Sequence, residues 1–505
     1  MKLLRPSFLR RATALRRSTS ATSARGVRAF SIAASTGSGD AEKPEILRPE
    51  GIDKAKKQYS LLDELPGLPQ LKPASQLQAP QTEITTLPSG LRVISQETYG
   101  QAATVGIFVD AGSRCEDASE TRSHAELVRE MESIGALTTA SCGREQIIYT
   151  VDVLRDNVEK AVELLADSVL NVEITPEEIE TIKTIMQYQT EDLMENPQAL
   201  LQEYVHLAAY GGDQALGRPL QCPLDQINAI TLDKVQQFRK KHFVAEKMVL
   251  AGSGIDHQTL VKMAERLFTG VVSSGGATPG ASQPGPVEYR GGLHTIDNPE
   301  TPFSYVALAF PTGGWHHEDL VPVCVLHTLL GGGDSFSAGG PGKGMYSRLY
   351  TSVLNRFYWV ESAFAFSSIH ADVGLLGIYG AGVPSHTSNL VALMLNQLLH
   401  IASFKVDEQE LQRAKNQLKS SVLMNLESRM ILYEDIGRQL LTYGTRESPE
   451  SVCAKIDNVT ADDLQRVMRE AMKHKPSVVY HGDARRFPTY DQVLKGLEEG
   501  LKNLQ

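Results

Sequence analysis

The sequence predicts an α+β fold made of two homologous α/β-roll halves, each with an antiparallel sheet covered by helices. Three observations support this fold class. Segments of the first half recur weakly, but in the same order, in the second half. Each half runs from strands through helices to a closing strand. A run of glycine, proline and serine separates the halves and is typical of a linker.

Strands are the first elements to recur. The hairpin that opens the first half consists of EITTL and LRVIS, which flank the turn residues Pro88, Ser89 and Gly90. The strand that follows ends in an acidic pair in both halves: VGIFVDAGSRCED ends at Asp117, and VALAFPTGGWHHED ends at Asp319. We therefore expect these two segments to be equivalent strands of the two sheets.

Two helical segments recur after these strands. ITPEEIE, from Ile174, matches VDEQELQ, from Val406, and both read as an acidic helix start followed by a long amphipathic stretch. INAITLDKV matches IDNVTADDL, and each leads through a basic helix to a closing strand. These closing strands are MVLAG, from Met248, and SVVYHG, from Ser477.

The first thirty residues have the composition of a mitochondrial transit peptide. They contain eight basic residues and no acidic residue, and they end in Arg28-Ala29-Phe30-Ser31, which resembles a presequence cleavage pattern. A disordered basic tail is the alternative interpretation. Removal of the eight positive charges would change the formal net charge from −10 to −18. Such an acidic chain favours basic ligands and disfavours nucleic acid as a partner.

The domain organisation follows from these features. We predict a transit peptide at 1–30, an N-terminal extension at 31–80, an N-terminal domain at 81–270, a linker at 271–292, and a C-terminal domain at 293–505 with a glycine-rich loop at 331–345. The longest apolar stretches are too short to span a bilayer, so the chain is expected to be soluble or at most peripheral. Five scattered cysteines without a CxxC pair argue against a disulfide framework and a thiolate zinc site.

The glycine-rich loop is the strongest candidate for a binding site. Residues 331–350 read GGGDSFSAGGPGKGMYSRLY, and a backbone so rich in glycine suggests that a ligand approaches it closely. A phosphate-binding P-loop would need Ser or Thr after Lys343, and the context of a dinucleotide fingerprint is absent. The central Pro341 and the apolar Phe336 and Met345 favour gripping or releasing a peptide. A mobile surface loop is the alternative.

These features together resemble the pitrilysin-like (M16) metallopeptidase family, and specifically its non-catalytic alpha subunits. The resemblance extends from about Glu83 to the C-terminus. It rests on the glycine-rich loop, with Asp334 where a further glycine is usual, on GREQIIYT from Gly143, and on LKSSVLMNLESRMILYEDIGRQLL from Leu418. It implies that the two predicted domains are the N-terminal and C-terminal M16-like domains.

Catalytic members of this family hold zinc with HxxEH and a distant glutamate. This chain has thirteen histidines but no pair spaced by four, so neither HxxEH nor HExxH exists. The zinc-site segment expected after Asp117 is missing, and His124 is interpreted as the start of a helix whose apolar face includes Leu127 and Met131. We therefore predict no catalytic residue, metal ligand or cofactor in this chain, and the resemblance implies zinc in a beta partner.

By resemblance, the chain is expected to bind presequences of imported precursors for cleavage by the zinc-bearing beta subunit, in a heterodimer of the mitochondrial matrix. A carboxylate can hold a guanidinium in a bidentate pair. The implied substrate-binding residues are Gly331, Gly332, Gly333, Ser335, Phe336, Gly339, Gly340, Gly342, Lys343, Gly344, Glu410, Glu434 and Asp435. The alternative for the three acidic residues is that they only solvate helix surfaces.

Two other functions are weighed against this one. A structural core protein of respiratory complex III has the same fold, and this alternative would place the chain peripherally on the inner membrane. An independently active peptidase conflicts with the absent zinc-binding histidines.

Overall fold

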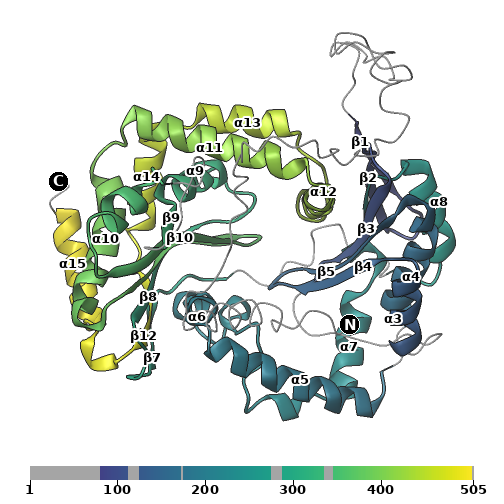
Figure 1. Ribbon diagram of the computed structural model, residues 1–505, viewed down its shortest axis with the longest axis horizontal. Coiled ribbons are helices and arrows are strands. Elements are labelled where there is room, and N and C mark those ends of the chain that lie inside the picture. Colours follow the sequence, from purple (N-terminus) through teal and green to yellow (C-terminus); the bar gives the residue numbers. More distant parts are fainter. Residues whose placement is uncertain (1–79, 112–123, 172–173, 274–286, 335–344, 503–505) are drawn as a thin grey trace, which may run out of the picture. The chain divides into compact units, whose positions relative to one another are not determined.

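The computed structural model describes residues 80–111, 124–171, 174–273, 287–334 and 345–502. These residues belong to one compact unit that begins at Pro80. Two six-stranded sheets, each packed with helices, form its framework (Figure 1). The predicted transit peptide and nearly all of the predicted extension lie outside the described residues.

The first sheet has the strand order β1-β2-β6-β3-β5-β4. Its strands are Thr82–Thr86 (β1), Arg92–Gln96 (β2), Ala102–Val109 (β3), Leu137–Cys142 (β4), Ile147–Leu154 (β5) and Met248–Ser253 (β6). The second sheet has the order β7-β12-β8-β11-β10-β9. Its strands are Gly292–Asp297 (β7), Ser304–Gly313 (β8), Gly332–Asp334 (β9), Val360–Ile369 (β10), Val373–Gly382 (β11) and Ser477–Gly482 (β12).

Five strands of each sheet repeat the same topology, whereas β1 and β9 are edge strands without a counterpart. In each sheet, one pair of neighbours is parallel, β2 with β6 and β7 with β12, while the remaining pairs are antiparallel. The first predicted pair of repeats forms β3 and β8, and the closing strands form β6 and β12. The predicted hairpin is present as β1 and β2, with Gly90 in its turn at φ +94°. The predicted α+β fold of two homologous halves is confirmed.

The helices also recur in pairs. The first half contains α3 (His124–Ser133), α4 (Val158–Leu170), α5 (Pro176–Met194), α6 (Pro197–Tyr210), α7 (Leu232–His242) and α8 (His257–Leu267). The second contains α9 (Leu320–Leu330), α10 (Thr387–Ser403), α11 (Glu408–Leu426), α12 (Arg429–Tyr443), α13 (Pro449–Asn458), α14 (Ala461–Ala471) and α15 (Tyr490–Lys502). The predicted helical repeats are α5 with α11, both of 19 residues, and α7 with α14, both of 11 residues.

Helix caps explain why the repeated helices begin where they do. Thr175 and Glu178 form a capping box at the start of α5, and Asp407 caps α11. Thr231 caps α7, and Thr460 caps α14. Helix α3 begins at His124 in the described chain and buries Leu127 and Met131, as its apolar spacing predicted.

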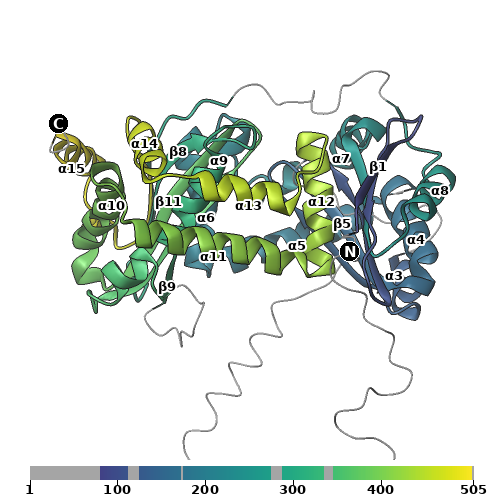
Figure 2. The same ribbon diagram turned by 90° about the horizontal axis from the view of Figure 1, so that it is seen from above.

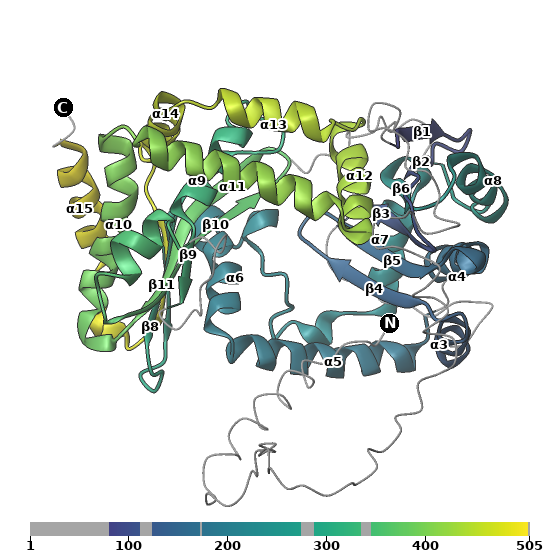
Figure 3. The same ribbon diagram turned by 45° about the horizontal axis from the view of Figure 1, so that its top comes forward.

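Each sheet has an apolar core on both faces. In β3, Val105 and Ile107 point into the core covered by α4 and α8, whereas Phe108 points to the opposite face. That opposite face is covered by α12, which comes from the second half of the chain (Figure 3). Reciprocally, α6 of the first half packs on β7, β8 and β12 of the second sheet. The halves therefore exchange one helix each, which the sequence did not predict.

Close contacts between glycines and aromatic rings seat α12 on the first sheet. Gly437 in α12 lies against the ring of Phe108, and a Cβ at this glycine would overlap the ring. A Cβ at Gly106 in β3 would likewise overlap the hydroxyl of Tyr433, which donates a hydrogen bond to the carbonyl of Tyr149 (3.2 Å). The exchanged helix thus approaches the strands more closely than any larger side chain at these glycines would allow.

The turn between β4 and β5, which contains the GREQ residues, also contacts the second half. Arg144 forms an ion pair with Glu203 of α6 (3.1 Å), and Glu145 accepts a hydrogen bond from the N–H of Ala371 (2.9 Å). Next to these groups, the ring of His206 in α6 lies 3.2 Å from that of His370, measured between the Nε2 atoms. Nδ1 of His206 also contacts the carbonyl of Gln202, and both rings contact the hydroxyl of Ser368.

Burial controls the charge of this histidine pair. Both residues are 6% exposed. Desolvation, with a smaller contribution from the nearby Arg144 guanidinium, lowers the pKa of His206 to about 3 and that of His370 to about 4. Both imidazoles are therefore neutral at neutral pH, and they form part of the contact between α6 and the turn that joins β10 to β11.

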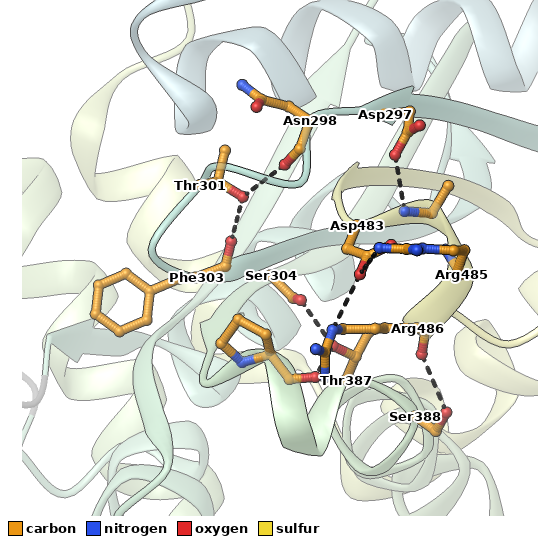
Figure 4. Close-up of polar contacts among 12 residues, drawn as sticks. Asp297, Asn298, Thr301, Phe303, Ser304, Thr387, Ser388, Asp483, Arg485 and Arg486 are labelled. Carbon is orange, nitrogen blue, oxygen red and sulfur yellow. Dashed lines mark hydrogen bonds and ion pairs between the residues drawn. The ribbon is translucent and has the colours of Figure 1, made fainter.

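Polar contacts hold β12 and α10 at one end of the second sheet (Figure 4). Asp297, at the end of β7, accepts a hydrogen bond from the N–H of Ala484 (2.9 Å), just after β12. Thr387, at the start of α10, donates a hydrogen bond to Ser304 at the start of β8 (2.7 Å). Asp483 forms ion pairs with the two arginines that follow Ala484. These contacts are structural because each group has its partner within the fold.

Within the described residues, no single helix is long and apolar enough to cross a membrane. The segments Pro384–Ser403 and Glu408–Leu426 meet that criterion only together, and the chain bends by 106° between them.

Candidate functional site

Part of the predicted glycine-rich loop belongs to the second sheet. Strand β9 consists of Gly332–Asp334 and pairs with β10 at the edge of the sheet. The N–H of Gly332 donates a hydrogen bond to the Oγ of Ser347 (3.2 Å), so the two flanks of the loop are joined. The predicted binding residues that lie outside the described residues are Ser335, Phe336, Gly339, Gly340, Gly342, Lys343 and Gly344.

The first glycines of this loop have a structural role. Gly332 has φ +137°, and a Cβ there would overlap the carbonyl oxygen of Ala363 in β10. A Cβ at Gly331 would overlap the side chain of Ser347. Gly333 has ordinary space around it. Strand pairing and closure of the loop flanks therefore require two of the three predicted glycines, independently of any ligand.

We expect Gly332→Ala to loosen β9 from β10 and to destabilise this edge by about 1–3 kcal/mol, because a methyl group would overlap the neighbouring strand. Hydrogen exchange of the backbone amides of β9 and β10 would measure the effect. Gly333→Ala is the matched control and should leave the exchange rates unchanged. Equal protection in both variants would show that Gly332 is not required for strand pairing.

A cleft of about 920 Å³, which we call the α11 cleft, lies beside the flanks of the loop. Its lining is Thr328, Leu329, Met345, Tyr346, Ser347, Glu410, Arg413, Ala414, Asn416, Gln417, Ser420, Ser421, Met424 and Asn425. One wall is a single face of α11, and the other consists of the end of α9 and residues 345–347. The structure therefore places one of the three predicted carboxylates, Glu410, next to the flanks of the glycine-rich loop.

Glu410 already has a cationic partner. Arg348 donates to both of its carboxylate oxygens, with Nε to Oε1 at 2.9 Å and Nη2 to Oε2 at 2.5 Å. Arg348 is only 8% exposed, so its charge depends on this carboxylate for compensation. An arginine of the protein thus occupies the bidentate position that the sequence analysis assigned to a substrate guanidinium.

The other two predicted carboxylates lie on α12. Asp435 lines a second cleft of about 310 Å³, the α12 cleft, between α11, α12 and α13; α13 lies alongside α11 (Figure 2). Its Oδ1 accepts a hydrogen bond from Gln439 (2.9 Å), and Arg446 lies 3.6 Å from its Oδ2. Glu434 pairs with Arg438 of the same helix (2.6 Å) and lines neither cleft. The three carboxylates do not converge on one site.

The sequence alone did not predict three residues of the α11 cleft or its border: Arg348, Arg413 and Met424. A periodic signal for the last two exists in the sequence. Positions three and four residues apart, continued from Glu410, recur on one face of an α-helix. Met424 is fourteen residues after Glu410, nearly four turns of the helix, so both side chains lie on this face. The pairing of Arg348 with Glu410 has no comparable local signal.

Within the part of the chain that the structure describes, no group of three or more His, Cys, Asp and Glu side chains is placed to hold a metal ion. His316 and His317, which the sequence places together, are exposed in the turn between β8 and α9. The imidazole of His317 accepts a hydrogen bond from the N–H of Asp319 (3.1 Å), which fits a structural role at the start of that helix.

Comparison with known proteins first defines the class of protein. Residues 117–224 match the model described as insulinase (peptidase family M16), and residues 229–418 match the peptidase M16 inactive domain. The structure resembles a chain of complex III2 from Candida albicans, Inz-5 bound, with a TM-score of 0.68, 20% identity, and coverage of 82% of this chain and 99% of that chain. At this identity, the structural likeness shows a shared fold.

Three curated relatives then show which branch of the M16 family the chain is similar to. The probable mitochondrial-processing peptidase subunit alpha-1 of Arabidopsis thaliana is 38% identical to this chain, and the match covers 83% of this chain and 85% of the length of that relative. The alpha subunit of Solanum tuberosum is 39% identical, covering 82% and 84%, and that of Homo sapiens is 33% identical, covering 83% and 85%. The chain belongs to the mitochondrial-processing peptidase alpha-subunit family of M16 proteins. The family resemblance predicted from the sequence is confirmed.

Proposed function

We propose that this chain is the non-catalytic, substrate-recognising alpha subunit of a mitochondrial processing peptidase. It binds the presequences of imported precursors and presents them to a zinc-bearing beta subunit in a heterodimer. The observation that carries the proposal is an identity of 33–39%, over more than four fifths of the chain, to proteins named as alpha subunits. The absence of HxxEH and HExxH from the full sequence supports a role without zinc chemistry of its own.

Charge supports the proposed substrate and location. The full chain has a formal net charge of −10, which becomes −18 without its basic first thirty residues. A negative protein attracts arginine-rich peptides and speeds their association at low salt. The relatives are named mitochondrial, and we propose the matrix as the compartment because imported presequences arrive there.

We expect a presequence peptide that contains arginine to be cleaved only by the mixture of this chain and a zinc-site beta partner. Each subunit alone should be inactive, because this chain lacks the zinc-binding motif and the partner alone lacks the recognition subunit. The measurement is the initial rate of peptide cleavage by each subunit and by the mixture.

A beta partner in which the glutamate of HxxEH is replaced by glutamine serves as the control. Loss of cleavage in that mixture would assign the chemistry to the partner. Cleavage by this chain alone would overturn the non-catalytic role. A purified heterodimer that cleaves no presequence would overturn the recognition role.

The alternative, a core protein of respiratory complex III, has less support. The observation that supports this alternative is the fold shared with a chain of the Candida albicans complex, at 20% identity. The relatives at 33–39% identity are instead named as processing-peptidase subunits. Co-purification with cytochromes would favour the alternative.

A further inference from the structure

We infer that the α11 cleft is a subsite for the apolar face of an amphipathic presequence, and that the arginines of the peptide point away from it. This inference rests on the proposed function, because it names which part of the proposed substrate the cleft takes. It changes the assignment made from the sequence, in which Glu410 would hold a substrate arginine.

Apolar side chains form part of the lining of the cleft. Tyr346 and Met424 are 77% and 66% exposed, Met345 adds further exposed apolar surface, and the buried Leu329 and Ala414 also line the cleft. Large apolar side chains that are exposed beside a concave surface favour binding to an apolar partner. The cleft has the volume of a binding site for several side chains, and it lies where α11 faces the joined flanks of the glycine-rich loop.

The charged groups that line the cleft disfavour a substrate arginine. Glu410 is the one carboxylate among the described lining residues, and its charge is compensated by the buried Arg348. Arg413 also lines the cleft, and no carboxylate among the described residues pairs with its guanidinium. A substrate arginine that entered here would therefore meet a like charge and no free carboxylate, which disfavours its binding by electrostatic repulsion.

The lining of the cleft can adapt to apolar groups of different shapes. Two methionines, Met345 and Met424, contribute to the lining from opposite walls of the cleft. The methionine side chain is flexible and polarizable, so a surface of this kind fits apolar groups of different shapes. Hydroxyl and amide side chains of α11, such as Ser421 and Asn425, offer hydrogen bonds around the apolar surface. The chemistry suits peptides that share an apolar face and a basic face without sharing a sequence.

The test uses the assembled heterodimer and a fluorescent presequence peptide with leucines on one face and arginines on the other. Met424→Asn should raise the Kd of this peptide roughly tenfold, because the substitution removes apolar contact area. The same variant should lose much of its discrimination against a peptide whose leucines are replaced by alanine. Its discrimination against a peptide whose arginines are replaced by glutamine should stay unchanged.

Leu423→Asn is the matched control, because Leu423 is the neighbouring residue on α11, is 48% exposed and lines neither cleft. Its Kd should equal that of the unmodified heterodimer. Arg413→Glu should leave the Kd unchanged or lower it. A Kd that rises in Arg413→Glu would overturn the inference, because Arg413 would then help to bind the basic peptide instead of repelling its arginines.

The outcomes separate this inference from the proposed function. If the unmodified heterodimer cleaves and binds the parent peptide but Met424→Asn binds it as tightly as Leu423→Asn does, the subsite is wrong and the recognition function stands. If the unmodified heterodimer neither binds nor cleaves any of the three peptides, the proposed function itself fails.

Discussion

Gly437→Ala is expected to destabilise the packing of α12 on the first sheet by about 1–3 kcal/mol, despite the higher helix propensity of alanine. The reason is steric: the added methyl group would overlap the ring of Phe108, which is fully buried and has no room to move aside. Thermal unfolding of the purified chain, followed by circular dichroism, would show the effect as a lower melting temperature.

Gly270→Ala is the control for Gly437→Ala, because nothing in the described structure lies within 4 Å of a Cβ at Gly270. Its melting temperature should match that of the unmodified chain. A second variant, Gly437→Ala combined with Phe108→Leu, should recover part of the lost stability by making room for the methyl group. Failure of this recovery, or an unchanged melting temperature in the single variant, would contradict the steric argument.

The chain is expected to lose stability as the pH falls from about 7 to 5, through its buried histidine pair. The pKa of His206 is lowered to about 3 and that of His370 to about 4, from an ordinary value of 6.5. At pH 5 the unfolded chain therefore takes up protons that the folded chain does not. Each imidazole then favours unfolding by about 2 kcal/mol at pH 5. The contribution of the neutral histidine pair to the free energy of unfolding is fully present above pH 6.5 and declines as the pH falls below 6.5.

Burial sets the sign of the effect, and the charged groups that face the pair change its size. The guanidinium of Arg144 disfavours protonation of both rings, and Glu145, with Oε2 3.8 Å from Nδ1 of His370, is itself partly buried and paired with a backbone N–H. Replacement of both histidines by glutamine should reduce the dependence of the melting temperature on pH between 5 and 7, although His242, whose pKa burial lowers to about 4, still contributes. Replacement of the exposed His316 should leave it unchanged. An equally steep dependence in the double variant would rule out the buried pair as its source.

The repeated elements could be predicted because their signals are local. Helix starts such as Thr175 and Asp407 are short capping patterns, and the closing strands are continuous apolar runs. The exchange of α6 and α12 could not be predicted, because an apolar helix face does not specify which sheet covers it. The alternation in β3, with Val105 and Ile107 opposite Phe108, shows only that both faces of the strand are buried.

The candidate site was predictable to a smaller extent. The sequence located the glycine-rich loop and Glu410, but the ion pair to Arg348 joins residues 62 positions apart and depends on the packing of α11. The strained conformation of Gly332 depends in the same way on a neighbouring strand. Composition therefore identified the segment, whereas three-dimensional packing shows that Gly332 and Glu410 already have structural roles.

The exchanged helices make the two halves mutually dependent for folding. Without α12, the apolar face of the first sheet formed by Ile94, Phe108 and Val249 would meet water, and the second sheet would lose its cover in the same way without α6. Neither half is therefore a complete folding unit, although the sequence predicts a linker between them. The arrangement is that of a helix-swapped homodimer whose two copies have been joined into one polypeptide.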